Sequence, residues 1–429
     1  MRKDKRRIGF PEILFVFVII ILFLHNSYTQ EADYYLGLSR YSFINYDTNK
    51  FLFPGNKFKA EEFFDQFDSL IHFGNKQINI VHVGGSHIQT DIYTHVVRKH
   101  LQGLTPDMNG GRGLLFPYKI AHTNGPLNYK VSYTGEWEYN KSTQHKRHLK
   151  TGLTGYAVST SDSIAEICIN PNSDPDIKYH FNGIRVYHEF TSYRISVCLT
   201  DSAYFGTYNS YFGYTSFNLN KSYDSLCLKV VSDTIDDSFT LQGILPEYSS
   251  PGIVYHTVGV NGAKLKSYLQ SEYYIKHLES IKPEMVIFSV GTNDAYTRRF
   301  DAKQYRKEYH QLIDSTLKAV PDVFILLTVP NDSYLYKKYV NTNTATMRTI
   351  IYDLAEEYGC GVWDFYTIMG GLNSSRAWNS LNLMKYDLIH FNKEGYILKG
   401  ELFFSAFLKS WEERLESPLS SYPDSLIDK

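Results

Sequence analysis

The sequence predicts an α/β fold with a parallel sheet, interrupted after its first strand–helix unit by an all-β insert. In residues 58–102, and again from residue 254 onwards, short apolar runs alternate with segments of helical periodicity. Strands that alternate with helices require right-handed crossovers and therefore form a parallel sheet. Between these parts, residues 104–252 show period-two alternation broken by Asn, Asp, Ser and Gly clusters. That pattern is typical of an antiparallel sandwich or jelly roll.

The individual elements follow from the same periodicities. In the first α/β part we expect a helix over 59–72, a strand over 78–83 and a helix over 90–101. In the insert, alternation is clearest at 195–199, 226–230 and 239–241, and no long helical pattern is found. In the second α/β part we expect strands at 255–258, 285–290, 323–329 and 361–365, and helices at 264–278, 302–319, 344–358 and 393–411.

The N-terminus reads as an export signal. A basic stretch (Arg2 to Arg7) precedes an apolar run from Ile13 to Leu24, which is too short to span a bilayer comfortably and suits a signal peptide. We expect cleavage near Thr29, although an uncleaved anchor starting at Phe10 is the alternative. The expected divisions are a signal peptide (1–29), a first α/β part (30–103), a Gly-rich connection with the β-insert (104–252), a second α/β part (253–415) and a polar tail (416–429).

Composition narrows the possible partners. The chain has 429 residues, 43% of them apolar and 21% charged, as in a folded globular protein. Its net charge of −1 gives no reason to expect nucleic acid or an anionic membrane surface as a partner.

The spacing of the cysteines does not predict which of them pair in disulfides. Cys168, Cys198, Cys227 and Cys360 lack CxxC spacing, and they predict neither a disulfide pattern nor a metal site. Cys198 and Cys227 fall within expected strands of one β-domain and could be neighbours, and buried free thiols are equally compatible with the sequence.

Chemistry-bearing residues follow the expected strands at their carboxyl ends. The strand over 78–83 leads into Gly84-Gly85-Ser86-His87, a sharp turn that places Ser86 near a helix N-terminus, where backbone N–H groups can stabilise an oxyanion. Taken alone, Ser86 is more simply read as a helix N-cap.

Three further turns favour the catalytic reading. The next expected strand ends in Gly259-Val260-Asn261-Gly262, and the following one in Gly291-Thr292-Asn293-Asp294. Asp387 stands three residues before His390, so its carboxylate can reach the histidine Nδ1 and leave Nε2 free as a general base. Parallel strands bring their carboxyl ends to one edge of the sheet, so these turns are expected to meet.

In these blocks the chain resembles the SGNH/GDSL hydrolases. The resemblance implies a flavodoxin-like three-layer fold and a serine esterase that needs no cofactor or metal. It implies Ser86 as nucleophile, His390 as base and Asp387 as its orienter. The oxyanion donors would be the N–H of Ser86, the N–H of Gly262 and the side-chain amide of Asn293. Gly85 departs from the family, which usually has Asp there, and this puts the rigidity of the nucleophile loop in question. His87 is expected to be a helix-start residue, with substrate contact as the alternative.

The insert adds a second resemblance. An exported SGNH domain split by a β-sandwich is similar to bacterial peptidoglycan O-acetylesterases, whose insert resembles a carbohydrate-binding module; residues 110–117, Trp137 and residues 152–155 look like their post-nucleophile region. Trp137 could stack on a sugar or pack in the core. The resemblance implies removal of O-acetyl groups from a cell-wall or extracellular polysaccharide. The alternatives are an O-acyltransferase acting on the same kind of glycan, and a glycan-binding protein with a decayed site.

Overall fold

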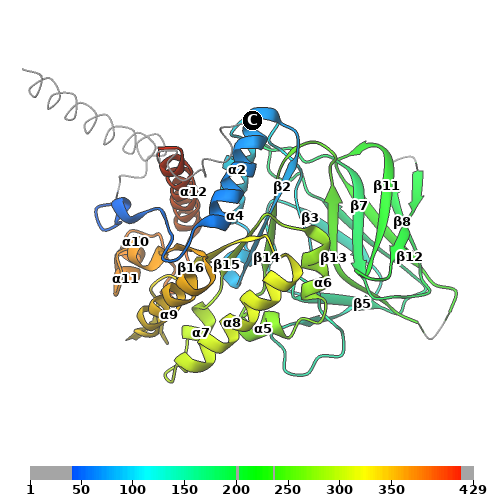
Figure 1. Cartoon of the computed structure of the whole chain (residues 1–429). Helices are drawn as coiled ribbons and strands as arrows, with labels where there is room; N and C mark the ends of the chain where they lie inside the picture. Colours follow the sequence, from blue (N-terminus) through cyan, green and yellow to red (C-terminus); the bar gives the residue numbers. More distant parts are fainter. Residues whose placement is uncertain (1–40, 200–201, 235–236, 417–429) are drawn as a thin grey trace, which may run out of the picture.

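The computed structural model describes residues 41–199, 202–234 and 237–416, and it divides visibly into an α/β part and an all-β part (Figure 1). The expected signal peptide and the tail beyond residue 416 lie outside these ranges. Within them, no helix is both long and apolar enough to cross a membrane.

The α/β part is built on a parallel sheet, as the alternation of strands and helices predicted. Its strand order is β1-β19-β16-β15-β2-β14, in which β1 is the antiparallel edge strand and the other five run parallel. The strands are β1 (Phe51–Leu52), β2 (Gln77–Gly84), β14 (Gly252–Gly259), β15 (Met285–Ser289), β16 (Phe324–Thr328) and β19 (Gly361–Trp363).

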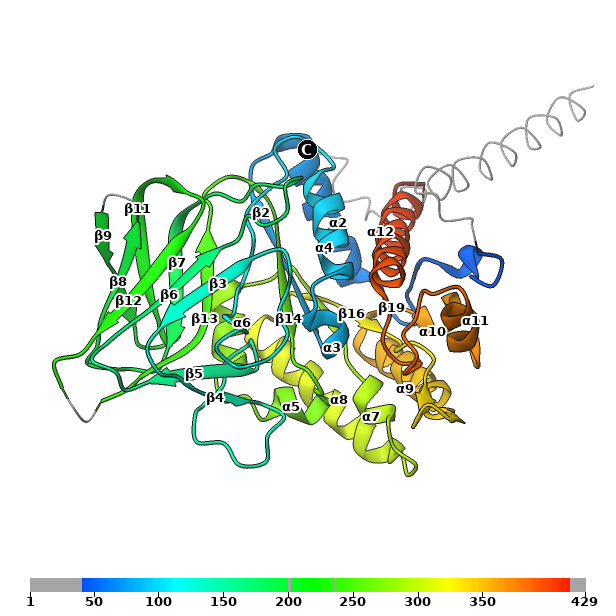
Figure 2. The ribbon, with the colours of Figure 1, turned by 180° about the vertical axis from the view of Figure 1, so that it is seen from behind.

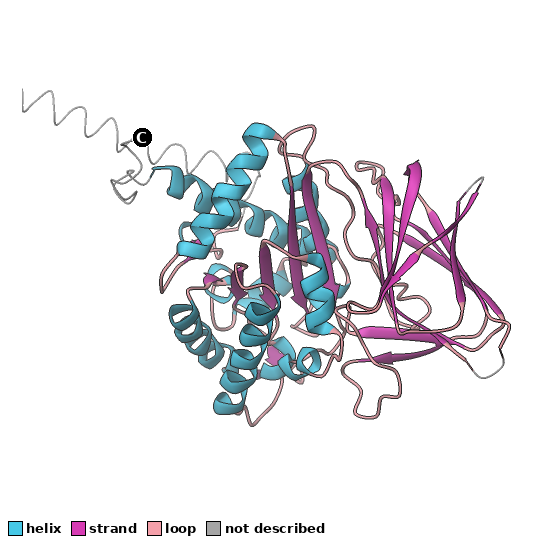
Figure 3. Ribbon diagram, turned by 45° about the vertical axis from the view of Figure 1, so that its right-hand side comes forward, coloured by secondary structure: helices cyan, strands magenta, loops and turns pink. Residues whose placement is uncertain are grey.

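Helices cover both faces of this sheet (Figure 2 and Figure 3). Ile78 and Ile80 of β2 are buried in one cluster with α2, α4 and α12, whereas Val81 and Val83 are buried in another with α5, α6, α8 and α9. Successive strand residues point to opposite faces, so β2 buries apolar side chains on both faces of the sheet. The helices are α2 (Phe58–Phe73), α3 (Ser86–Gln89), α4 (Tyr93–Gln102), α5 (Leu265–Leu269), α6 (Tyr274–Ile281), α7 (Thr292–Ala295), α8 (Ala302–Ala319), α9 (Asn343–Tyr358), α10 (Phe365–Ile368), α11 (Ser374–Ser380) and α12 (Lys393–Glu416).

The single helix expected over 264–278 is wrong, because the chain there forms α5 and α6 with a break between them. At the break, the Ser271 hydroxyl donates to the Gly152 carbonyl at 2.5 Å, and the Tyr273 N–H donates to the Thr151 carbonyl at 3.1 Å. The insert thus accepts the Tyr273 N–H, which a continuous helix would pair with the carbonyl of Leu269. Helical periodicity cannot reveal such a long-range competitor.

Residues 104–252 form antiparallel sheets, as the period-two alternation predicted, and no helix is assigned in the described part of this segment. One sheet has the order β10-β11-β7-β13-β5-β4 and the other β3-β6-β12-β8-β9. Residues of both, such as Val186 and Leu228, join one buried apolar cluster. The strands are β3 (Lys130–Thr134), β4 (Glu138–Lys141), β5 (Tyr156–Thr160), β6 (Ile164–Asn170), β7 (Phe181–His188), β8 (Arg194–Leu199), β9 (Ser202–Phe205), β10 (Thr207–Asn209), β11 (Tyr214–Tyr223), β12 (Leu226–Val231) and β13 (Phe239–Glu247).

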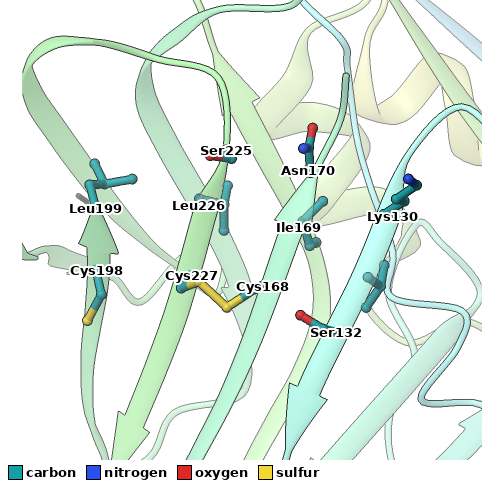
Figure 4. A pocket seen from close by; sticks show the side chains of 11 residues that line it. Lys130, Ser132, Cys168, Ile169, Asn170, Cys198, Leu199, Ser225, Leu226 and Cys227 are labelled. Carbon is teal, nitrogen blue, oxygen red and sulfur yellow. A yellow bond between two sulfur atoms is a disulfide. The ribbon is translucent and has the colours of Figure 1, made fainter. Parts of the chain in front are cut away.

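Three cysteines lie side by side on the second of these sheets (Figure 4). Cys227 on β12 is in register with Cys168 on β6 and with Cys198 on β8. Cys168 and Cys227 form a disulfide, whereas Cys198 and Cys360 are free. Cys198 and Cys227 are therefore neighbours, but the bond joins Cys227 to the strand on the other side.

Candidate active site

The structure brings together the three residues expected to form a catalytic triad. Ser86 ends the turn after β2 and is the first residue of α3. Its Oγ lies 2.8 Å from Nε2 of His390, 304 positions later in the chain. The other ring nitrogen, Nδ1, lies 2.9 Å from Oδ2 of Asp387. A Ser–His–Asp chain of hydrogen bonds therefore stands at the carboxyl edge of the parallel sheet.

Backbone N–H groups in the turn before α12 hold the Asp387 carboxylate in place. One carboxylate oxygen accepts the N–H groups of Ile389 and His390, both at 2.9 Å, while the other faces the His390 ring. Burial alone would raise the pKa of this carboxyl, but the hydrogen bonds from the His390 ring and from the two N–H groups hold the pKa well below its ordinary value. Asp387 is therefore ionised at neutral pH and can orient the imidazole.

Asn293 and the turn around Gly262 converge on Ser86. The Asn293 Nδ2 donates to the Ala263 carbonyl at 3.0 Å, which leaves its second N–H for another acceptor. A methyl group built on Gly85 would lie 3.2 Å from that Nδ2 and 3.9 Å from the carbonyl oxygens of Val260 and Ala263. Because Gly85 has no side chain, the Asn293 amide can lie directly beside the nucleophile. A larger residue at position 85 would make a tight contact with this amide.

Gly262 has a backbone conformation that suits glycine. Its φ is +82°, in the region that L side chains rarely adopt, and a Cβ there would meet nothing within 4 Å. In the described structure, neither the Gly262 N–H nor the Ser86 N–H donates to a protein acceptor. Both N–H groups are therefore available to a ligand oxygen.

His87 points into the protein rather than towards a substrate. It is 6% exposed, its Nδ1 lies 2.9 Å from the Tyr396 hydroxyl, and its ring centroid is 5.2 Å from that of His390. Burial, reinforced by the positive charge of Lys399 and by His390, lowers the pKa of His87 well below its ordinary value. His87 is therefore a neutral, buried residue beside His390, and its contacts favour a packing role over substrate contact.

A buried ionic cluster holds the turn between α3 and α4. Asp91, at φ +48°, accepts hydrogen bonds from Arg98 at 3.1 and 3.0 Å and from Arg112 at 2.6 Å. Burial raises the pKa of Asp91, but the two guanidinium groups outweigh this and hold the pKa far below its ordinary value. The helix expected over 90–101 therefore begins only at Tyr93, as α4, and the bond from Arg112 ties the turn before it to the Gly-rich connection.

Sequence reasoning missed Gln89, the last residue of α3. It is 1% exposed and hydrogen-bonds the turn that carries Gly262. A lone glutamine in a helical pattern carries no motif, so no signal in the sequence could have singled it out.

Trp137 is partly buried against the insert core. Its indole N–H donates to the Thr134 carbonyl at 2.8 Å, and its ring meets Phe239 edge-on at 6.4 Å. These contacts account for its position through packing. Within the described ranges, no group of His, Cys, Asp and Glu side chains is arranged to hold a metal ion.

Comparison with known proteins assigns part of the chain to a family of hydrolases. Residues 238–398 match the model of the GDSL-like Lipase/Acylhydrolase family. The matched segment includes Gly262, Asn293, Asp387 and His390, while Ser86 lies before the insert. No curated protein matches the sequence.

Among solved structures, one described as a peptidoglycan O-acetylesterase in action is similar over most of the chain. Its identity is 18% and its TM-score 0.70, with 85% of this chain and 99% of the other covered. At that identity the likeness shows a shared fold. An acetyl xylan esterase aligns at 21% identity over 36% of this chain and 81% of its own, with a TM-score of 0.30. A GDSL-like lipase from Bacteroides thetaiotaomicron aligns at 16% over 38% and 76%, with a TM-score of 0.28. The family match over residues 238–398, together with the fold shared with a peptidoglycan O-acetylesterase, supports a serine ester hydrolase.

Proposed function

We propose that this protein is an exported serine esterase that removes O-acetyl groups from a cell-wall or extracellular polysaccharide. The observation that carries the proposal is the continuous hydrogen-bonded chain from Ser86 through His390 to Asp387, with contacts of 2.8 and 2.9 Å. Nucleophile, base and orienter at these distances are what acyl transfer by a serine requires.

In the proposed mechanism, the Ser86 hydroxyl attacks the acetyl carbonyl carbon while His390 Nε2 takes its proton. Asp387 keeps the proton of Nδ1 facing itself and stabilises the imidazolium that forms. The negative charge on the carbonyl oxygen is received by the N–H groups of Ser86 and Gly262 and by the Asn293 amide. His390 then protonates the departing sugar oxygen, and a water molecule activated by the same histidine releases acetate from Ser86.

The substrate class rests on two supports. The fold shared with a peptidoglycan O-acetylesterase extends over 85% of this chain and therefore includes the insert as well as the α/β part. In the sequence, the blocks around Ser86, Asn293 and His390 resemble those of SGNH/GDSL hydrolases, and their interruption by a β-insert is similar to bacterial peptidoglycan O-acetylesterases. Acetylated peptidoglycan and acetylated polysaccharide are accordingly the substrates to test first.

The proposal also includes export of the protein and a flavodoxin-like type for the α/β part. The basic stretch and apolar run at the N-terminus suit a signal peptide, and the Cys168–Cys227 disulfide fits an oxidising compartment. The α/β part is assigned to the flavodoxin-like type. Numbered along the chain, its parallel strands β14-β2-β15-β16-β19 follow the order 2-1-3-4-5 of such sheets, with helices on both faces.

The test is acetate release from O-acetylated peptidoglycan and from acetylated xylan by the purified protein and by Ser86→Ala. We expect release by the wild type and none by the variant; equal release by both would overturn the triad assignment. Analysis of the products with an unacetylated glycan present separates a hydrolase, which yields only acetate, from a transferase, which acetylates the acceptor. A fluorophosphonate probe should label Ser86 in the folded protein, and a lack of labelling would favour a decayed site.

A further inference from the structure

Gln89 joins the nucleophile helix to the turn that carries Gly262. It is three residues after Ser86 and closes the same short helix, α3. Its Oε1 accepts the backbone N–H of Asn261 at 2.6 Å and the hydroxyl of Tyr156 at 2.9 Å. Asn261 directly precedes Gly262, so this side chain ties the peptide next to the proposed oxyanion donor to the helix of the nucleophile.

The other end of the Gln89 amide reaches the Gly-rich connection before the insert. Its Nε2 donates to the Asn124 carbonyl at 2.6 Å and to the Thr123 hydroxyl at 3.2 Å. The side chain of Asn261 meets the same segment, because its Nδ2 donates to Asn124 Oδ1 at 2.6 Å and to Thr123 Oγ1 at 3.2 Å. Residues 123–124 therefore hold both Gln89 and the turn that Gln89 supports.

A buried amide with partners at both ends is restricted to one orientation. Reversing the Gln89 amide would set its NH₂ group against the Asn261 N–H and its carbonyl against the Asn124 carbonyl. Each reversed contact would be repulsive and, at 1% exposure, without water to relieve it. The orientation of Gln89 thus fixes the Asn261–Gly262 peptide relative to Ser86.

We propose that Gln89 is a positioning residue for ester hydrolysis, through which the insert and its connection hold the Gly262 N–H in place to receive the oxyanion. This inference rests on the proposed function. It makes the segment 104–252 part of the catalytic framework, since Thr123, Asn124 and Tyr156 all belong to it. Tyr118, from the same segment, adds a hydroxyl that donates to the Gly259 carbonyl at 3.0 Å.

The chain offers a matched control in Gln102. This residue ends α4, is 4% exposed, and donates through Nε2 to the carbonyls of Gly111 and Ile253 at 2.8 and 2.6 Å. Like Gln89, it bridges a helix of the α/β part to the connection. Its amide donates to Gly111 and Ile253 and not to the turn that carries Gly262. If such a bridge only stabilises the fold, its loss should therefore change kcat equally at both positions.

The first experiment compares Gln89→Met with Gln102→Met, because methionine keeps the length of glutamine and removes its hydrogen bonds. The readouts are kcat and KM for p-nitrophenyl acetate, together with the melting temperature. Complete loss of one oxyanion donor costs about 10²–10³ in turnover, so a displaced donor should cost about tenfold or more. We expect a lower melting temperature for both variants. Only Gln89→Met should lose kcat about tenfold or more, with KM nearly unchanged. Equal effects of the two variants on kcat would overturn the proposal.

Tyr156→Phe keeps the proposal testable if Gln89→Met fails to fold, because it removes one hydroxyl and preserves the ring. We expect a fall of a few-fold in kcat in the wild-type background. Where Gln89→Met does fold, adding Tyr156→Phe to it should cause no further fall, since the partner is already gone. A Tyr156→Phe enzyme with wild-type kcat would contradict the link to the insert.

Ser86→Ala in the same assay separates the two proposals. If Ser86→Ala keeps its activity, the proposed function fails. If it is inactive and Gln89→Met behaves like Gln102→Met, only the positioning role fails.

Discussion

Nδ1 of His390 lies 2.9 Å from Oδ2 of Asp387, and the backbone N–H of the same histidine donates to the other oxygen of that carboxylate, also at 2.9 Å. His390 thus contacts the carboxylate that orients it through both its imidazole ring and its backbone N–H. The carboxylate cannot rotate without losing one of these bonds. The imidazole is therefore held in the tautomer that leaves Nε2 free to accept the Ser86 proton.

Asp387→Asn tests this arrangement. The amide would no longer accept reliably from Nδ1–H, and the tautomer with its proton on Nε2 would be favoured, so we expect kcat to fall by about 10⁴, as for the same change in a serine protease triad. The measurement is steady-state hydrolysis of p-nitrophenyl acetate, with circular dichroism to verify the fold. A loss below tenfold would show that Asp387 does not orient the base.

Asn293→Ala tests the proposed oxyanion site. Removal of its amide should lower kcat by about 10²–10³ and change KM little, because the donor acts on charge that develops during the reaction. Asn182→Ala is a suitable control, since that amide donates to Ser249 within the all-β part at 2.7 Å and should leave kcat unchanged. Similar kcat values for the two variants would rule out Asn293 as a donor.

Asp294, beside Asn293, should make stability depend on pH. Burial raises its pKa to about 7, only partly offset by the Leu265 N–H, and its Oδ2 has no protein partner in the described structure. The folded state then keeps a proton that the unfolded state loses above pH of about 4. Because the folded state binds more protons at Asp294 in this window, the contribution of Asp294 to stability falls as pH rises from about 4 to about 7.

Asp294→Asn removes this titration, so it should gain stability relative to the wild type over the same window, by about 1.4 kcal/mol per pH unit at most. Urea unfolding of both proteins at pH 4.5, 6 and 7.5 measures the difference. A difference that stays constant with pH would mean that Asp294 is ionised in the folded protein throughout.

The disulfide should contribute measurably to stability. Cys168 and Cys227 are 59 positions apart, and closing a loop of that length in the unfolded chain corresponds to about 4 kcal/mol. The Cys168→Ser/Cys227→Ser variant should therefore unfold at lower urea concentration, as should the wild type in the presence of a reductant. Cys198→Ser is the matched control on the neighbouring strand, and we expect it to change stability little. Equal stability of all three proteins would contradict a disulfide at this position.

The sequence by itself predicted the helices and strands whose buried residues recur with a regular period. It also predicted the candidate site residues in the turns. The helix expected over 302–319 is α8 to the residue, and the strand expected over 78–83 lies within β2. Ser86 and Asn293 could be singled out because parallel strands bring their carboxyl ends to one edge of the sheet. Asp387 could be paired with His390 because a separation of three residues places them within one turn.

Only the tertiary structure decided which distant groups meet. It broke the helix expected over 264–278 at Ser271, where the insert supplies competing hydrogen bonds, and it joined Cys227 to Cys168 rather than to Cys198. It also gave Gln89 its partners, which lie 34 to 172 positions away along the chain. Local periodicity depends on neighbours along the chain, whereas these choices depend on which donors, acceptors and sulfur atoms the completed fold places within bonding distance.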